Sequence, residues 1–353
     1  MKKILVVNVN WMGDAIFSTP VFRALKEAYP AARVSCLAVP RVREILESIP
    51  QIDEIMIYDE NGKHRNPWAK ARLICELRRC HFDAAFLLHR SLTKALLVFA
   101  AGIPQRIGYD TKGRGFFLTH RLEANTVSRR PERSEGLKAL KATTHRCDDY
   151  LNIIESFGIP VKDRATFLDV GHESREEMMG ILASHKIAEQ DFLVVVHPGG
   201  NWDLKRWPEK NFSLLIERLM TGANVRVIIT GTREDMPLAD RIASQSQCRV
   251  LILAGQITLK QLIALMKRAN LVISADSGPL HLASSVGTDV IGLFGPTRPE
   301  VTGPRGNGRS FILQHDVGCN FKPCYHLECP DNICMQSVTV EEVLDVVRQI
   351  RNS

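Results

Sequence analysis

Short apolar runs alternate with segments of helical periodicity along the whole chain. Runs suited to buried strands lie at residues 4–9, 34–38, 54–58, 84–88 and 106–109, and again at 192–197, 225–230, 250–253, 271–274 and 290–294. Helical spacing of apolar residues occurs between them, for example at residues 19–27, 68–79, 208–220 and 259–267. Such alternation is typical of doubly wound α/β domains with parallel sheets. The pattern predicts the same α/β architecture twice.

The length of the chain, 353 residues, also favours two hydrophobic cores over one. We expect an N-terminal domain over residues 1–170, a C-terminal domain over residues 171–338 and a closing helix over residues 339–353. A polar stretch that ends at Ser174 marks the junction, which we place within residues 165–185.

The lengths of the apolar stretches indicate where in the cell the protein is found. None approaches the roughly 18 consecutive apolar residues that cross a bilayer. Asn8, Asn10 and Asp14 interrupt the apolar start of the chain before it reaches the length of a signal peptide. We therefore expect a cytoplasmic protein that is soluble or peripheral at a membrane.

Positive charge gathers in the N-terminal half. The formal net charge is +7, yet residues 60–150 alone hold 18 Lys and Arg against 9 Asp and Glu. A basic region of this kind fits nucleic acid, anionic lipid or a phosphorylated substrate. A solvated basic surface without a partner fits the charge equally well.

Asp14 directly follows the first expected strand and opens a helix. Ligands of open α/β sheets bind beyond the carboxyl ends of the strands, so Asp14 would face the ligand site. An Asp at this point is also a good helix N-cap, and position alone favours the cap.

The segment from His197 to Pro208 joins the first strand of the second domain to its helix. Gly199 and Gly200 let backbone N–H groups approach a phosphate, and Lys205 and Arg206 can neutralise it. Asn201 lies in the same loop. Trp202 and Trp207 flank the basic pair, a composition that favours a binding role over a plain surface loop.

The segment Ser274-Ala-Asp-Ser-Gly-Pro-Leu-His281 carries a buried strand into a tight turn and a helix. The free N–H groups and positive dipole end of that helix would receive a diphosphate at Ser277 and Gly278. Asp276 and Ser277 could instead act only as a cap, and His281 as a packed core residue. The next strand leads into Phe294-Gly-Pro-Thr-Arg-Pro299, which we expect beside the Asp276 turn.

Four cysteines, Cys319, Cys324, Cys329 and Cys334, recur every five residues with His326 between them. Four thiols can hold zinc, but the usual C-x-x-C pairs are missing, and reduced thiols are the default in a cytosolic protein. The sequence also lacks G-x-G-x-x-G, a Walker G-x-x-x-x-G-K-[ST] and an Asp-x-Asp pair. Handling of a diphosphate without a metal fits these observations best.

Taken together, the motifs resemble glycosyltransferase family nine, the ADP-heptose:lipopolysaccharide heptosyltransferases. The similarity rests on Asn10-Trp-Met-Gly-Asp14, on Phe99-Ala-Ala-Gly-Ile-Pro-Gln-Arg-Ile-Gly108, on Lys205-Arg-Trp-Pro208, on Asp276-Ser-Gly-Pro-Leu-His-Leu-Ala283 and on Phe294-Gly-Pro-Thr297. The first two segments are most similar to the branch that adds the second inner-core heptose. The cysteine-rich loop departs from the best-studied members.

The resemblance implies a GT-B fold, in which two Rossmann-like domains face a cleft. It implies an inverting, metal-independent transfer of heptose from ADP-heptose to the anionic Kdo–lipid A core, with one heptose already in place, at the inner face of the cytoplasmic membrane. The N-terminal domain would bind this acceptor and the C-terminal domain the donor. No cofactor and no nucleic acid are expected, and the basic N-terminal half would meet the anionic acceptor at the membrane.

The resemblance also assigns roles to residues. Asp14 would be the general base, which replaces the cap as the preferred interpretation, and Lys205 would stabilise the departing ADP. Asp276 would hold sugar hydroxyls, and Glu234 or its neighbour Asp235 would meet the ribose. The residues expected to bind the donor are Gly199, Gly200, Asn201, Arg206, Glu234, Asp276, Ser277, Gly278 and His281.

Other functions remain open at this point. The first is a GT-B enzyme with another nucleotide-sugar donor, and the second is a nucleotide-sugar 2-epimerase, which would need no separate acceptor. The third is a non-catalytic basic module that binds membrane or nucleic acid through residues such as Arg129 and Arg130.

Overall fold

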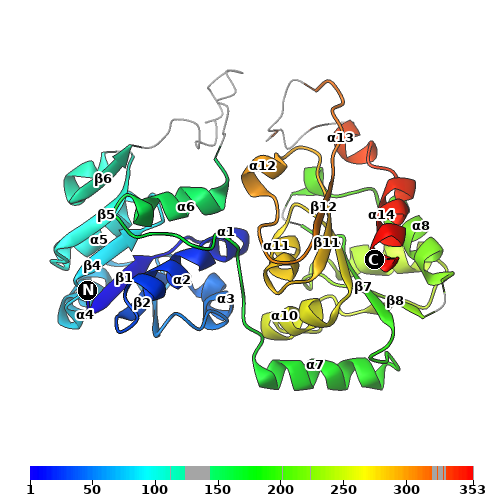
Figure 1. Ribbon diagram of the computed structural model, residues 1–353, viewed down its shortest axis with the longest axis horizontal. Coiled ribbons are helices and arrows are strands. Elements are labelled where there is room, and N and C mark those ends of the chain that lie inside the picture. The colour runs from blue at the N-terminus through cyan, green and yellow to red at the C-terminus, as the bar shows by residue number, and fades with distance from the viewer. Residues whose placement is uncertain are drawn as a thin grey trace. The chain divides into compact units, whose positions relative to one another are not determined.

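Two separate sheets organise the chain. The structure is a computed structural model that describes residues 1–111, 113–123, 144–200, 202–222, 224–319, 324, 329 and 331–352. The described chain divides after Asp169 into two compact units, called unit 1 and unit 2 below. Each unit contains one six-stranded sheet (Figure 1). The prediction of two doubly wound α/β domains with parallel sheets is confirmed.

Unit 1 has the strand order β3-β2-β1-β4-β5-β6, with every pair parallel. Its strands are β1 (Lys3–Val7), β2 (Arg33–Ala38), β3 (Glu54–Ile57), β4 (Ala84–Leu87), β5 (Gln105–Asp110) and β6 (His120–Glu123). Its α-helices are α1 (Met12–Phe17), α2 (Thr19–Ala28), α3 (Arg43–Glu47), α4 (Pro67–Cys80), α5 (Leu92–Ala100) and α6 (Arg146–Glu155). Among the described residues, the short 3₁₀ turn η1 (Pro40–Val42) lies between β2 and α3, and η2 (Arg114–Phe117) lies between β5 and β6.

Helices cover both faces of the sheet of unit 1. On one face, Leu5 and Val7 of β1 join a buried cluster with Leu73 of α4 and Leu97 of α5. Successive strand side chains point to opposite faces, so Ile4 and Val6 lie on the other face, which α2 and α6 cover. Burial on both faces explains why β1 reads as an unbroken apolar run rather than an alternating one.

Unit 2 repeats the arrangement with the strand order β12-β11-β10-β7-β8-β9, again all parallel. Its strands are β7 (Phe192–His197), β8 (Val225–Ile229), β9 (Leu251–Ile252), β10 (Leu271–Ala275), β11 (Asp289–Leu293) and β12 (Ser310–Leu313). Its helices are α7 (His172–Ser184), η4 (Asp203–Lys205), α8 (Glu209–Met220), α9 (Met236–Gln245), α10 (Leu259–Arg268), α11 (Gly278–Ser285), α12 (Pro299–Thr302), α13 (Ile333–Gln336) and α14 (Val340–Arg351).

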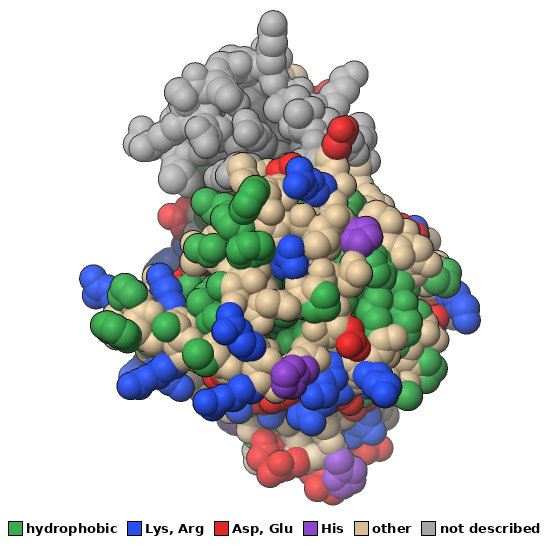
Figure 2. Space-filling view, turned by 90° about the vertical axis from the view of Figure 1, so that its left-hand side faces the viewer, with side chains coloured by type: hydrophobic (Ala, Val, Ile, Leu, Met, Phe, Trp, Pro, Cys, Tyr) green, Lys and Arg blue, Asp and Glu red, His purple; other side chains and the backbone are tan. Residues whose placement is uncertain are grey.

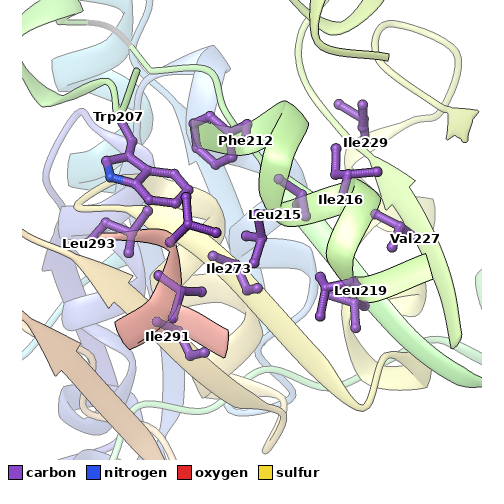
Figure 3. Close-up of a cluster of buried hydrophobic side chains, with 14 of the residues drawn as sticks. Trp207, Phe212, Leu215, Ile216, Leu219, Val227, Ile229, Ile273, Ile291 and Leu293 are labelled. Atoms are coloured by element: carbon purple, nitrogen blue, oxygen red, sulfur yellow. The ribbon is translucent and has the colours of Figure 1, made fainter. Parts of the chain in front are cut away.

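The core of unit 2 forms where α8, α9 and α14 pack on one face of its sheet (Figure 3). Trp207 is 2% exposed, stacks edge-on against Phe212 and donates its indole N–H to the carbonyl oxygen of Val338 (2.8 Å). Trp207 therefore belongs to the core and contributes no surface to the loop between β7 and α8. Its ring faces the core, so of the two tryptophans only Trp202 remains beside the basic pair.

Two strands escaped the sequence analysis, and both lie at the edge of a sheet. β6 reads His-Arg-Leu-Glu and is mostly exposed, and β12 follows the glycine-rich turn at Gly306 and Gly308 and is half-buried. An edge strand buries fewer side chains than a central one, so it needs no apolar run. The other strands lie within two residues of their expected bounds.

The expected junction at residues 165–185 contains a helix. α7 begins at His172 and packs against α10 through Met178 and Leu182, both of which are buried. Its outer side is charged, which explains why its sequence reads as a polar stretch. Within the described residues, no helix has the length and apolarity needed to span a bilayer.

Replacing Trp207 with Phe should destabilise the protein, because the buried carbonyl of Val338 loses its donor and part of the indole volume stays empty. We expect a loss of about 1–3 kcal/mol in the free energy of unfolding, measured as a Tm lowered by several degrees. Trp68, which is 82% exposed, provides the matched control, and Trp68→Phe should leave the Tm almost unchanged. Equal effects of the two substitutions would contradict the core role of Trp207.

Candidate functional site

Each sheet reverses its direction of winding at its centre. In unit 1 the reversal lies between β1 and β4, and in unit 2 between β7 and β10. Ligands of doubly wound sheets bind beyond the carboxyl ends of the strands at this switch point. Asp14 follows β1, and Lys205 and Asp276 follow β7 and β10, so the structure places all three at switch points.

Asp276 is the centre of a polar cluster in unit 2. Its carboxylate is 4% exposed and accepts hydrogen bonds from Lys205 Nζ (2.8 Å) and Thr302 Oγ1 (3.2 Å). The Nε2 atom of His281 lies 3.3 Å from the other carboxylate oxygen. Lys205 Nζ also donates to the backbone carbonyl of Asp276 (3.1 Å). Lys205, His281 and Thr302 thus converge on the carboxylate of Asp276.

The charge state of Asp276 follows from these contacts. Burial opposes its ionisation, but the hydrogen bond from His281 and the positive charge of Lys205 hold the pKa of its carboxyl well below the ordinary value. The group is therefore an anion at neutral pH and only accepts hydrogen bonds. Lys205 and His281 are held in fixed positions around it.

Helix α11 begins directly after this cluster. Ser277 stands at its N-cap, but its hydroxyl contacts Ser274 Oγ (2.9 Å) rather than a backbone N–H of the helix. Asp276 is occupied by Lys205 and His281, so the interpretation of Asp276 and Ser277 as a simple cap is wrong. Pro279 has no N–H, which leaves Gly278 and Leu280 as the first-turn donors for an anion.

The loop after β7 packs tightly against Asp235. A Cβ atom on Gly199 would lie 2.6 Å from Asp235 Oδ2, so a larger residue there would displace the Asp235 carboxylate. Asp235 accepts hydrogen bonds from the N–H and the hydroxyl of Thr232 (2.9 Å each). Glu234, in contrast, is exposed, and hydrogen bonds within its own turn lower the pKa of its carboxyl. Of the two acids, Glu234 is the one accessible to a ligand.

Arg206 spans the same loop. Its guanidinium donates to the carbonyl of Gly200 (3.0 Å) and pairs with Asp203 (2.8 Å). The ring of Trp202 lies beside Lys205, with Nζ 5.2 Å from the ring centroid. Asn201, which was also expected to bind the donor, lies outside the described residues.

The segment after β11 reaches the same cluster, as expected from the pairing of β10 with β11. Thr302 at the end of α12 supplies one of the three donors to Asp276. Among the described residues, no group of three or more His, Cys, Asp or Glu side chains is placed to hold a metal ion. His326 of the cysteine-bearing loop lies outside the described part of the chain.

In unit 1, Asp14 lies in the first turn of α1 and is half-buried. The N-cap of this helix is Trp11, so the interpretation of Asp14 as the N-cap is wrong. Its Oδ1 accepts a hydrogen bond from the hydroxyl of Tyr150 on α6 (3.0 Å). Burial and the negative charge of Asp14 raise the pKa of Tyr150 well above its ordinary value, so the phenol stays protonated and donates. Tyr150 fixes one carboxylate oxygen of Asp14.

Lys94 is a functional candidate that the sequence analysis missed. It is 1% exposed, and Nζ donates to the side chain of Asn10 (2.7 Å) and to the backbone carbonyl of Asn8 (3.3 Å). Lys94 therefore ties α5 to the loop that leads from β1 to Asp14. The sequence does indicate that Lys94 is buried. Lys94 lies three and four residues before Leu97 and Val98, and this spacing puts it on the same apolar face of the helix.

A second group of buried charges lies beyond β4 and β5. Arg114 is fully buried and donates to the carbonyls of Tyr109 and His89. Arg90 pairs with Asp149 (3.4 Å), whose pKa is raised by burial despite this cation. No role was predicted for these residues from the sequence. Their contacts join different segments of the chain, and no local motif connects them.

The buried state of Lys94 predicts a pH dependence of stability. Burial lowers the pKa of Lys94 from 10.5 to about 8. Between these values the unfolded chain binds more protons than the folded one, so the contribution of Lys94 to the free energy of unfolding rises with pH. The difference between wild type and Lys94→Met should increase by about 1–2 kcal/mol from pH 8 to pH 10 in urea titrations. Lys162→Met, at an exposed site, should show no such trend, and a flat difference for Lys94→Met would contradict its burial as a cation.

Comparison with known proteins finds relatives that match this chain over most of its length. The sequence model of glycosyltransferase family 9 (heptosyltransferase) matches residues 70–332. The chain is 26% identical to lipopolysaccharide heptosyltransferase 2 of Salmonella typhimurium, covering 86% of this chain and 85% of that protein. It is 27% identical to lipooligosaccharide heptosyltransferase 2 of Haemophilus ducreyi, covering 90% of each.

Solved structures share the fold. A family 9 glycosyl transferase from Veillonella parvula matches with a TM-score of 0.83 at 22% identity, covering 99% of this chain and 97% of that one. ADP-heptose lps heptosyltransferase II of E. coli matches with a TM-score of 0.78, also at 22% identity, covering 99% and 98%. The expected GT-B type of fold is thereby confirmed. Because the family model covers most of its length, the chain belongs to glycosyltransferase family 9, as its motifs indicated, and is a glycosyltransferase.

Proposed function

We propose that this enzyme transfers a heptose, with inversion, from ADP-heptose to the inner core of lipopolysaccharide, on a Kdo–lipid A acceptor that already carries one heptose. The observation that carries the proposal is the buried Asp276 anion, which holds Lys205 beside the N-terminus of α11 at the switch point of unit 2. The family membership and the names of the similar proteins supply the sugar and the acceptor.

Unit 2 is the proposed donor-binding unit. The departing group of the reaction is ADP, whose terminal phosphate gains negative charge as the glycosidic bond breaks. Lys205 Nζ and the N–H groups of Gly278 and Leu280 are preorganised positive groups that would stabilise this charge. They need no metal ion for this role, and the sequence has no Asp-x-Asp pair to hold one.

Other residues of unit 2 would orient the donor. Glu234 is exposed after β8 and would accept hydrogen bonds from the ribose hydroxyls. Gly199 and Gly200 would let the backbone approach the nucleotide, with Arg206 holding their loop in shape. Asp276 already has three donors, so we propose that it orients Lys205 first and contacts a sugar hydroxyl with its remaining acceptor capacity.

Unit 1 is the proposed acceptor-binding unit, with Asp14 as general base. Asp14 would take the proton of the acceptor hydroxyl while the hydroxyl oxygen bonds to the anomeric carbon of the heptose. The bond from that carbon to the phosphate oxygen breaks, and its electron pair leaves with ADP. Tyr150 holds Oδ1 of Asp14, which leaves Oδ2 for the acceptor hydroxyl. Attack from the face opposite ADP inverts the anomeric configuration.

We also propose that the enzyme works at the inner face of the cytoplasmic membrane as a peripheral protein. The acceptor is anchored in lipid and carries carboxylates and phosphates. The excess of Lys and Arg in residues 60–150 supports this location by charge complementarity.

The test is transfer of heptose from ADP-heptose to heptose-primed Kdo–lipid A without added metal. Wild type should form product, and Asp14→Asn should be slower by about 10²–10⁴-fold in kcat because the base is lost. Lys205→Met should be slower by about 10²–10³-fold because the leaving group loses its cation.

Matched controls are Asp240→Asn and Lys210→Met, two exposed positions of unit 2 that should keep wild-type rates. Wild-type kcat in a folded Asp14→Asn variant would contradict the base assignment. No transfer by a wild type that binds ADP would contradict the proposed donor and acceptor pair.

A further inference from the structure

Large hydrophobic side chains are exposed on unit 1. Four of them lie together on α5 and η2 and are called the α5 patch: Leu92 (45% exposed), Leu96 (45%), Phe99 (41%) and Phe116 (74%). Monomeric proteins seldom leave apolar groups of this size gathered on their surface without a partner. The catalytic roles proposed above use none of the four.

The α5 patch is built on a rigid base. Leu92, Leu96 and Phe99 are spaced four and three residues apart, so they share one face of α5. The rings of Phe99 and Phe116 are 6.2 Å apart, and Phe117 packs edge-on against both at 5.3 and 5.4 Å. The other face of α5 is buried through Ala95, Leu97 and Val98 in the core of unit 1. The exposed side chains therefore cannot be hidden by a small rotation of the helix.

Arginines are fixed at the border of the α5 patch. Arg106 lies with Cζ 5.3 Å from the ring centroid of Phe99 and donates to the carbonyl of Phe117 (2.6 Å). Arg78, on the neighbouring α4, donates to the carbonyl of Ala100 at the end of α5 (2.7 Å). Figure 2 looks onto the side of unit 1 where α4 and α5 lie in Figure 1 and shows hydrophobic, Lys and Arg side chains interspersed. An apolar centre is thus bordered by positive charge.

From this combination we infer that the α5 patch docks on the surface of an anionic lipid bilayer. Leu and Phe side chains would enter the boundary between head groups and acyl chains, and Arg78 and Arg106 would meet the lipid phosphates. The inference rests on the proposed function, since an acceptor anchored in lipid requires the enzyme at a membrane.

A second copy of the chain is the less suitable occupant. A two-fold dimer formed through this patch would place the same surface of both copies together. Such an interface would bring Arg78 and Arg106 of both copies into one contact surface, and gathering like charges at an interface is unfavourable. An anionic bilayer carries the opposite charge, and the exposed aromatic rings can enter it as they would enter a protein interface.

The test is sedimentation of the full-length protein with vesicles, without donor or acceptor. Wild type should bind vesicles of phosphatidylethanolamine and phosphatidylglycerol (3:1) more tightly than vesicles of phosphatidylcholine, and high salt should weaken the binding. The double variant Leu96→Ser/Phe116→Ser should bind at least tenfold more weakly, because two apolar side chains no longer enter the lipid. Leu214→Ser, at a 37% exposed position of α8, is the matched control and should bind like wild type.

Light scattering measures the mass of each variant, and a soluble acceptor measures its transfer activity away from a membrane. The double variant should have the mass of wild type and should transfer heptose to a deacylated, water-soluble acceptor at the wild-type rate. Equal vesicle binding by wild type and the double variant would overturn the inference, as would a wild-type dimer that the double variant breaks. Vesicle binding is measured without substrates. It therefore tests the α5 patch even if the proposed transfer reaction is not observed.

Discussion

The ion pair between the buried carboxylate of Asp276 and Lys205 holds together the segments that follow β10 and β7 in unit 2. A carboxylate at the end of a central strand loses most of its hydration, so it is stable there only with close positive and polar partners. Lys205, His281 and Thr302 provide them, and each comes from a different loop or helix. Contacts with one buried anion therefore hold η4, α11 and α12 together. A site held in this way needs little reorganisation when a charged ligand arrives.

In unit 1, too, side chains from distant helices hold the segment that carries the proposed functional residue. There the loop after β1 is held by a buried cation, since Lys94 reaches Asn8 and Asn10 from α5. Tyr150 then fixes Asp14 from α6. The two units have the same strand order, and the switch point lies at the same place in each. In unit 1 the buried Lys94 holds the loop after β1, and in unit 2 the buried Asp276 holds Lys205 in the loop after β7. The group held at the switch point differs, because it is the acid Asp14 in unit 1 and the cation Lys205 in unit 2.

The sequence predicted the parts of this arrangement that are local. The strands β7 and β10 are apolar runs followed by turn residues, and the segment from Ser274 to His281 shows both its strand and its helix. Lys94, Tyr150 and Arg114 were missed because their partners lie between 5 and 136 residues away and no spacing rule connects them. The burial of Trp207 could not be predicted for a related reason. Its neighbours Lys205 and Arg206 are polar loop residues, and only the fold shows that its ring turns inward to Val338.

Calorimetry with wild type and Lys205→Met would compare the affinities of the enzyme for ADP and for AMP, which lacks the terminal phosphate. If Lys205 and α11 receive the terminal phosphate, wild type should bind ADP about 10–100-fold more tightly than AMP, since charge-assisted hydrogen bonds contribute about 1.5–3 kcal/mol. Lys205→Met should lose most of this preference while its affinity for AMP stays nearly constant. An unchanged ratio of the two affinities in the variant would contradict this role of Lys205, because the lysine would then make no contact with the terminal phosphate of ADP.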